Sequence, residues 1–330
     1  MSVVGIKRML NKIIDDISKN HPGATFLGNE GSPCVVSEWL STGTFPLDAI
    51  LGGGLPVGRI TEIYGDTSTG KSLLAAQVVA LAQEDGHICV MADTETAVSL
   101  PIMEAVGVDI DTLIYDSPDT VEEVFELFDD AIEAKNKHSP DSLLLLVWDS
   151  IAATSAAAEM SNEYGKATMA QHARLISHGL RKITRKISKG RVCALFLNQT
   201  RVKIGVMFGD KVATFGGKAV GFHASVRVQL RLGPKIKSGG QIVGIEAIAT
   251  VVKNKVAMPF KSANLPIFFG YGVDNALASL YYLKEAGDVV ASSSWHTISI
   301  DGKEIRFQKK GWDDVFDEHY DAIVAMIIGG

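Results

Sequence analysis

The stretch Gly65-Asp66-Thr67-Ser68-Thr69-Gly70-Lys71-Ser72 points most directly to the fold of this chain. It matches the pattern GxxxxGK(S/T) and joins a predicted strand, Ile60–Tyr64, to a predicted helix over 71–84. Glycines in such a loop allow backbone N–H groups to curl around phosphate oxygens, and the helix start adds a positive dipole end. We interpret the stretch as a P-loop, with Lys71 directed at the β- and γ-phosphates of a nucleotide and the Ser72 hydroxyl at Mg²⁺. All eight residues are candidate nucleotide-binding residues.

A second motif supplies the carboxylate that Mg²⁺ requires. Leu143–Trp148 is an uninterrupted apolar run, typical of a strand buried on both faces, and Asp149 follows it directly. In P-loop proteins an aspartate at this place supports the metal ion. Asp149 is therefore a candidate metal residue together with Ser72, and the alternative is an aspartate that only caps the next segment.

Hydrolysis of a phosphate anhydride also needs a group that takes a proton from water. Asp93 and Glu95 follow a predicted strand over 87–92, which we expect beside the P-loop strand. Either carboxylate would lie at the carboxyl edge of the sheet, where open α/β sheets bind ligands. The pattern does not choose between the two, and a solvated loop carboxylate remains the alternative for each.

Apolar strands and helical periods alternate through the middle of the chain, which indicates an α/β fold. Uninterrupted apolar strands separated by helices are typical of a mostly parallel sheet covered on both faces. After residue 222, strands over 223–232, 241–253 and 264–269 follow one another and predict an antiparallel extension of the same sheet. The remaining candidates are strands at Ile60–Tyr64, His87–Ala92, Thr112–Tyr115, Leu143–Trp148 and Val192–Leu197, and helices over 71–84, 119–135 and 169–188.

The two ends are expected to form smaller parts. Residues 3–18 have the spacing of an amphipathic helix that stops before His21-Pro22-Gly23, and the pattern leaves open whether it packs on its own domain or on a neighbouring chain. Near the other end, a helix over 274–286 precedes a hairpin about Asp301-Gly302 and a final helix from Trp312. We therefore predict three parts, over 1–36, 37–269 and 270–330.

Composition excludes several classes of protein. The 330 residues are 46% hydrophobic and 21% charged, as in ordinary globular proteins. The net charge of −6 excludes nucleic-acid binding by bulk charge, so any such binding needs a local basic surface. Three separated cysteines offer no disulfide framework, and no apolar run is long enough to cross a bilayer. We expect a cytoplasmic protein that does not bind membranes.

Two segments fit a local basic surface. Residues 174–191 carry seven cations and no acid, which favours phosphate binding over a solvated face, since such a face usually carries glutamates as well. Residues 200–217 read as a long loop with apolar and basic side chains and several glycines, and loops longer than about 12–15 residues are usually functional. A buried strand is the competing interpretation of 200–217, and its glycines argue against it. The seven cations are Arg174, Arg181, Lys182, Arg185, Lys186, Lys189 and Arg191.

With these residues in hand, the chain resembles the RecA family of recombinases from about Ser41 to beyond Lys261. Besides the P-loop, the resemblance rests on STGTFPLD at 41–48, GLPVGR at 54–59, NQTRVKIGVMFG at 198–209 and VVKNKVAMPFK at 251–261. It implies a RecA-type P-loop ATPase core, an N-terminal helical arm that packs on the neighbouring subunit, and a small α+β C-terminal domain. It further implies ATP and Mg²⁺ as cofactors, a homo-oligomeric filament on single-stranded DNA, and strand exchange with homologous duplex DNA.

The resemblance also implies individual roles. Glu95 matches the general base, and Gln199 matches a glutamine that senses the γ-phosphate. Lys253 and Lys255 match lysines that approach ATP from the neighbouring protomer, and Phe222 matches an aromatic residue at the subunit interface. DNA loops are implied at about 159–168 and 200–215. The candidate DNA-binding residues are Met169, Arg174, Ser177, Arg181, Arg201, Lys203, Gly216, Gly217 and Lys218.

The chain departs from the family near the base of the nucleotide. Leu100 and Met103 stand where the family has an aspartate and a tyrosine beside adenine, so looser nucleotide selectivity is expected. Lys218 replaces a common asparagine and adds charge beside the second DNA loop. Two other functions compete: a hexameric DNA helicase on the same core, and an ATP-switched scaffold without catalysis. The strings at 198–209 and 251–261 favour the recombinase, and Glu95 with an intact P-loop argues against the scaffold.

Overall fold

We analysed a computed structural model of the chain, which describes residues 3–27, 35–156, 169–202 and 212–329. The chain divides into two compact units, Met1–Ser37 and Glu38–Gly330. The first contains α1 (Val3–Asn20), which ends directly before His21-Pro22-Gly23, as its sequence predicts. The three-part division over 1–36, 37–269 and 270–330, and the packing of α1 on a neighbour, stay predictions.

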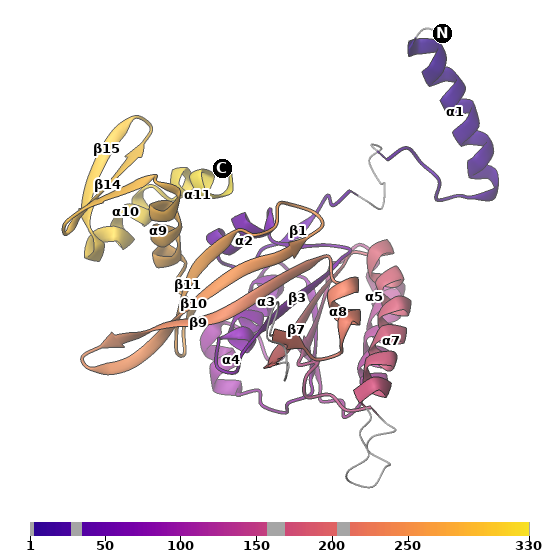
Figure 1. The fold of residues 1–330 in the computed structure, drawn as a ribbon, viewed down its shortest axis with the longest axis horizontal. Helices are drawn as coiled ribbons and strands as arrows, with labels where there is room; N and C mark the ends of the chain where they lie inside the picture. The colour runs from indigo at the N-terminus through magenta and orange to yellow at the C-terminus, as the bar shows by residue number, and fades with distance from the viewer. Residues whose placement is uncertain (1–2, 28–34, 157–168, 203–211, 330) are drawn as a thin grey trace. The chain divides into compact units, whose positions relative to one another are not determined.

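One large sheet forms the centre of the second unit (Figure 1). Its order is β12-β11-β10-β9-β3-β7-β6-β4-β5, with β8 paired to β7. Strands β9, β3, β7, β6, β4 and β5 are parallel, whereas β10, β11 and β12 extend the sheet in antiparallel fashion, which confirms the predicted α/β fold. The strands are β3 (Ile60–Gly65), β4 (Ile88–Asp93), β5 (Ile114–Asp116), β6 (Leu144–Asp149), β7 (Val192–Val202), β8 (Val212–Thr214), β9 (Val226–Ser238), β10 (Gln241–Asn254), β11 (Ser262–Phe268) and β12 (Gly272–Val273).

One prediction about strand order is wrong. The strand before Asp93 was expected beside the P-loop strand, but β3 lies between β7 and β9, and β4 pairs with β6. Alternation of strands and helices identifies a parallel sheet without giving the order of its strands, because a crossover helix can pass over intervening strands. In the actual register Asp93 lies opposite Asp149, and Gly65 lies opposite Gln199.

Helices cover both faces of the sheet. Strand β6 is buried on both sides: Leu145 and Val147 pack in one core with α3 (Lys71–Glu84) and α4 (Leu100–Val106). Leu144, Leu146 and Trp148 pack in the other core, with α5 (Val121–His138), α7 (Met169–Lys189) and α8 (Lys218–His223). A capping box of Thr120 and Glu123 starts α5. These two cores position the carboxyl ends of the parallel strands at one edge.

The last part of the chain packs on α2 (Phe45–Leu51), which connects the short paired strands β1 (Trp39–Leu40) and β2 (Leu55–Pro56). Helix α9 (Asn275–Ala286) and strands β14 (Trp295–Ile300) and β15 (Lys303–Gln308) match the predicted helix and hairpin, with Asp301 and Gly302 at positive φ. A third strand, β13 (Val289–Ser292), pairs with β14 and was not predicted. The single predicted last helix is two helices, α10 (Trp312–Glu318) and α11 (Tyr320–Ile328), both packed in this core. No helix in the described ranges is both long and apolar enough to cross a membrane.

Candidate nucleotide site and nucleic-acid interface

The P-loop connects β3 to α3, where the sequence places it. Gly65 and Gly70 are both required: a Cβ on Gly65 would lie 2.2 Å from the Leu230 carbonyl oxygen, and one on Gly70 would lie 2.4 Å from Ile267. Gly70 also has φ of 88°, a value that side chains other than glycine rarely adopt. The tight turn therefore brings the backbone of the loop directly against the first turn of α3, as phosphate binding requires.

Lys71 lies over this loop. Its Nζ donates to the carbonyl oxygens of Gly65 (3.0 Å) and Asp66 (2.7 Å). Burial lowers the pKa of Lys71, and the charges of Asp149, Glu95 and Asp66 oppose that effect. The ammonium group is thus held among acids at the point where a phosphate would approach the loop.

Ser72 and Asp149 come together as predicted. The Ser72 hydroxyl hydrogen-bonds the Asp149 carboxylate, and burial raises the pKa of Asp149 to about 6, with further increases from Glu95 and Asp93. A hydroxyl and a carboxylate are the hard oxygen ligands that Mg²⁺ prefers, and a buried carboxylate in acidic surroundings is stabilised by a cation. These two residues therefore fit a magnesium ion shared with phosphate oxygens.

The geometry distinguishes Asp93 from Glu95. Asp93 is 2% exposed, and its carboxylate accepts hydrogen bonds from the backbone N–H groups of Glu95, Ala97 and Val98 and from the Tyr115 hydroxyl at 3.0–3.2 Å. These four hydrogen bonds use both oxygens of the Asp93 carboxylate and hold the loop after β4 in place. Glu95, in contrast, is exposed at the edge of the site and available to a water molecule.

Glu95 is in contact with the predicted phosphate sensor. Its Oε1 accepts hydrogen bonds from Nε2 of Gln199 (2.8 Å) and from Oγ of Ser150 (2.5 Å). The Thr200 hydroxyl donates to the Asp66 carboxylate in the P-loop. Sequence reasoning missed Ser150 and Thr200, and their only signal was that each directly follows a residue already singled out.

A cavity of about 840 Å³ opens beside the P-loop. Met103 lines it together with Ser72, and the place of Met103 beside the base of a nucleotide stays a prediction. Leu100 is 57% exposed and is not among the lining residues. Several apolar residues from β9–β11 and the segment after them also line the cavity and were not predicted; they are Leu232, Ile242, Ile245, Ile267 and Phe269.

Several predicted DNA-binding residues border two adjoining hollows. Arg174, Ser177 and Lys218 line one of about 380 Å³, together with Phe222. Arg201 lines the other, of about 230 Å³, and Gly216 lines both. The second hollow also contains Gly217, and Arg181 lies near enough to His223 for its charge to lower the pKa of that histidine. Lys203, the loop at 159–168 and the residues 203–211 lie outside the described part of the chain, and Met169 is placed only as the first residue of α7.

The basic stretch over 174–191 is less free than its sequence indicates. Lys182 and Lys186 both pair with Asp129 of α5, and Arg191 pairs with Glu38. Three of the seven cations therefore form ion pairs with acidic residues from distant parts of the chain. The absence of acids within the stretch was a poor guide, because helix packing brings acids from another element.

The interpretation of 200–217 as one loop also needs correction. Strand β7 continues to Val202, and β8 pairs with it so that Thr200 lies opposite Thr214. The ends of the segment are thus a paired ribbon, and Thr214 is 7% exposed. Glycines at 216 and 217 follow the ribbon and did not prevent strand pairing before them.

Lys253 and Lys255 lie beside α8. Lys253 Nζ donates to the carbonyl oxygens of Gly221 (2.7 Å), Phe222 (3.2 Å) and Ala224 (2.6 Å), and burial with nearby cations lowers its pKa to about 8. Lys255 Nζ lies 5.9 Å from the centre of the Phe222 ring, which is 75% exposed. Lys255 and Phe222 are exposed and Lys253 is half-buried beneath α8, and their role toward another subunit stays a prediction.

Comparison with known proteins agrees with the resemblance found in the sequence. The family model described as the RecA N-terminal domain matches residues 8–274. Protein RecA of Colwellia psychrerythraea is 39% identical over 284 residues, which cover 86% of this chain and 80% of that protein. Protein RecA of Chlorobium limicola is 40% identical over 291 residues (87% and 81%), and that of Rhodospirillum centenum is 41% identical over 270 residues (82% and 73%).

Proposed function

This chain belongs to the RecA family of recombinases, and from that premise we propose that it uses ATP and Mg²⁺ to assemble filaments on single-stranded DNA. In these filaments it pairs the strand with a homologous duplex and exchanges strands, in DNA recombination and repair. Hydrolysis of ATP is stimulated by DNA. One observation carries the proposal. Gln199 hydrogen-bonds Glu95, and Gln199 belongs to β7, the strand that continues directly into the second predicted DNA loop.

The chemistry follows from the residues at the sheet edge. The P-loop backbone and Lys71 hold the phosphates, and Ser72 with Asp149 would hold Mg²⁺, which neutralises phosphate charge. Glu95 takes a proton from the attacking water, because its carboxylate is exposed and held in place by Ser150 and Gln199.

DNA and the neighbouring subunit bind on the surfaces described above. The two adjoining hollows present Arg174, Arg201 and Lys218 to a phosphate backbone, with glycines that permit close approach. Across the filament interface, Lys253 and Lys255 approach the triphosphate of the adjacent subunit and act in trans as an arginine finger does. Hydrolysis then depends on subunits aligned by DNA.

The test is strand exchange between circular single-stranded DNA and homologous linear duplex DNA. We expect joint molecules with ATP or a slowly hydrolysed analogue, and none with Lys71→Ala, which lacks the phosphate counter-charge. Exchange by Lys71→Ala would refute the nucleotide-site assignment. Unwinding of a forked duplex without exchange would favour the helicase, and a lack of DNA-stimulated phosphate release would favour the scaffold.

A further inference from the structure

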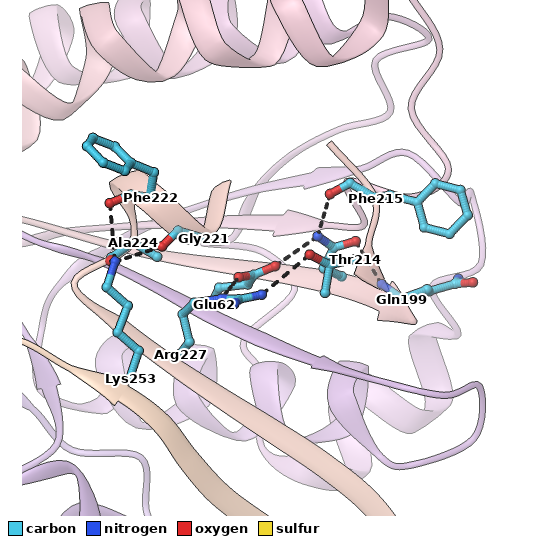
Figure 2. Close-up of polar contacts among 10 residues, drawn as sticks. Glu62, Gln199, Thr214, Phe215, Gly221, Phe222, Ala224, Arg227 and Lys253 are labelled. Carbon is cyan, nitrogen blue, oxygen red and sulfur yellow. Dashed lines mark hydrogen bonds and ion pairs between the residues drawn. The ribbon is translucent and has the colours of Figure 1, made fainter. Parts of the chain in front are cut away.

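A buried cluster of polar side chains crosses the three central strands. Glu62 on β3 is 0% exposed, and it pairs with Nε of Arg227 on β9 (Figure 2). Its Oε1 accepts a 2.9 Å hydrogen bond from Nδ2 of Asn198 on β7, a residue that is also fully buried. A buried carboxylate is stable only when it is paired and hydrogen-bonded, so these contacts hold the three side chains in one arrangement.

One end of the cluster reaches the nucleotide site. Glu62 lies three residues before Gly65 of the P-loop. Asn198 Oδ1 accepts a 2.9 Å hydrogen bond from the backbone N–H of Gln199. The Gln199 side chain points away from the cluster (Figure 2) and donates to Glu95. A displacement of Gln199 toward a phosphate must therefore also act on Asn198.

The other end reaches the second loop. Asn198 Nδ2 also donates to the carbonyl oxygen of Phe215 (3.0 Å), and the second arm of Arg227 donates to the Thr214 hydroxyl (3.4 Å). These two residues directly precede Gly216 and Gly217, which line the proposed DNA surface. A single side chain, Asn198, thus touches both the sensor and the start of that surface.

Arg227 also supports α8. A Cβ on Gly221 would lie 3.1 Å from Cζ of Arg227, so only a glycine allows the helix to lie this close without a shift. The carbonyl of Gly221 accepts a hydrogen bond from Lys253, and Phe222 follows it (Figure 2). The guanidinium further lies 4.7 Å from the centre of the Tyr64 ring, one residue before the P-loop.

We propose that Glu62 and Arg227 are positioning residues that couple nucleotide binding to DNA binding within one subunit. Within the described ranges, neither residue lines the nucleotide cavity or the two hollows. The pair holds Asn198, Thr214 and α8 so that a change at Gln199 is carried to residues 214–222. The inference rests on the proposed function and adds to it an ion pair between the buried Glu62 and the half-buried Arg227, which the recognised motifs do not contain.

The test uses two variants and a matched control. Glu62→Gln keeps the volume and an oxygen for Asn198 but removes the ion pair. Glu62→Gln combined with Arg227→Gln leaves no unpaired buried charge, and it decides the matter if the single variant does not fold. Asp48→Asn is the control, since Asp48 is also buried (3% exposed) and accepts hydrogen bonds from Ser41 and Thr42, away from β7.

Coupling is measured as a ratio of affinities. The affinity of the protein for a labelled single-stranded oligonucleotide is determined with and without a slowly hydrolysed ATP analogue, which gives one ratio. The affinity of the protein for the analogue is determined with and without DNA, which gives the second ratio. Linkage requires the two ratios to agree, and such ratios are typically about 5- to 150-fold. We expect both variants to reduce the ratio to roughly onefold to threefold, with the affinity for the analogue alone changed less than about threefold, and Asp48→Asn to keep the full ratio.

Each outcome decides a separate question. A full ratio in the folded double variant overturns the coupling role of the pair, and so does an equal loss of coupling in Asp48→Asn, because general destabilisation would then explain both. A ratio near one in the unaltered protein overturns the proposed function itself, since ATP would not control DNA binding at all.

Discussion

The neighbouring acids Asp93 and Glu95 are expected to respond in opposite ways to the same change from carboxylate to carboxamide. Glu95→Gln retains a carbonyl oxygen that Gln199 and Ser150 can still donate to, and the side chain is exposed. Stability should therefore change by no more than about 0.5 kcal/mol. Turnover should fall about 10²- to 10⁴-fold, because an amide does not accept a proton from water.

Asp93→Asn changes a buried acceptor instead. Its two oxygens accept four hydrogen bonds, three of them at Oδ2 and the fourth, from the Glu95 N–H, at Oδ1. An asparagine keeps one oxygen, so its amide group faces a donor at the other position. An unsatisfied buried pair of this kind costs about 1–3 kcal/mol. At about 2–4 °C for each kcal/mol, the melting temperature should fall by roughly 2–12 °C.

Both variants are compared with the unaltered protein in two assays, thermal unfolding and DNA-stimulated phosphate release under saturating ATP. Glu95→Gln should lose turnover at an unchanged melting temperature, and Asp93→Asn should melt earlier while keeping part of its turnover. Undiminished phosphate release by Glu95→Gln would transfer the role of base to Asp93. An unchanged melting temperature for Asp93→Asn would refute the hydrogen-bond argument.

Three further predictions concern stability, selectivity and assembly. Burial raises the pKa of Asp48 to about 6, so its protonated form favours the folded state and the stability it contributes below pH 4 is lost as the pH rises through 6. Relative to Asp48→Asn, the protein should lose roughly 2–4 kcal/mol between pH 4 and 7.5 in chemical denaturation, and a constant difference would contradict this. The apolar cavity beside Met103 should let GTP support DNA-stimulated hydrolysis within roughly tenfold of ATP, whereas a preference above a hundredfold would indicate specific base recognition. Mixing Lys71→Ala with the double variant Lys253→Ala/Lys255→Ala should restore part of the ATPase lost in each, and no recovery despite co-assembly would remove the role in trans.

Local patterns predicted the parts of the fold that local chemistry determines. The P-loop needs glycines at fixed spacing between a strand and a helix, and it lies where the sequence places it. The apolar run Leu143–Trp148 predicted a strand buried on both faces, and Asp149, the last residue of β6, lies beside Ser72. Asp301 and Gly302 favour a tight turn through their own backbone preferences.

The errors arise where distant residues decide. Lys182 and Lys186 looked like free cations because Asp129 is more than fifty residues away along the chain. Strand β8 is too short for its sequence to show the alternation of apolar and polar residues that predicts a strand. Only its pairing with β7 in the structure identifies it. The choice between Asp93 and Glu95 required the positions of Ala97, Val98 and Tyr115, and no periodicity supplies those.

The position of β7 explains why one short segment touches so many parts of the site. In the observed order β7 lies between the P-loop strand β3 and the strand β6 that ends at Asp149. Three consecutive residues at its carboxyl end therefore reach three different partners: Asn198 contacts Glu62, Gln199 contacts Glu95, and Thr200 contacts Asp66. Had β4 been the neighbour of β3, as the sequence pattern led us to expect, β7 would not separate the P-loop from the carboxylates. The strand order, rather than any single motif, joins the hydrolysis site to the segment that continues toward DNA.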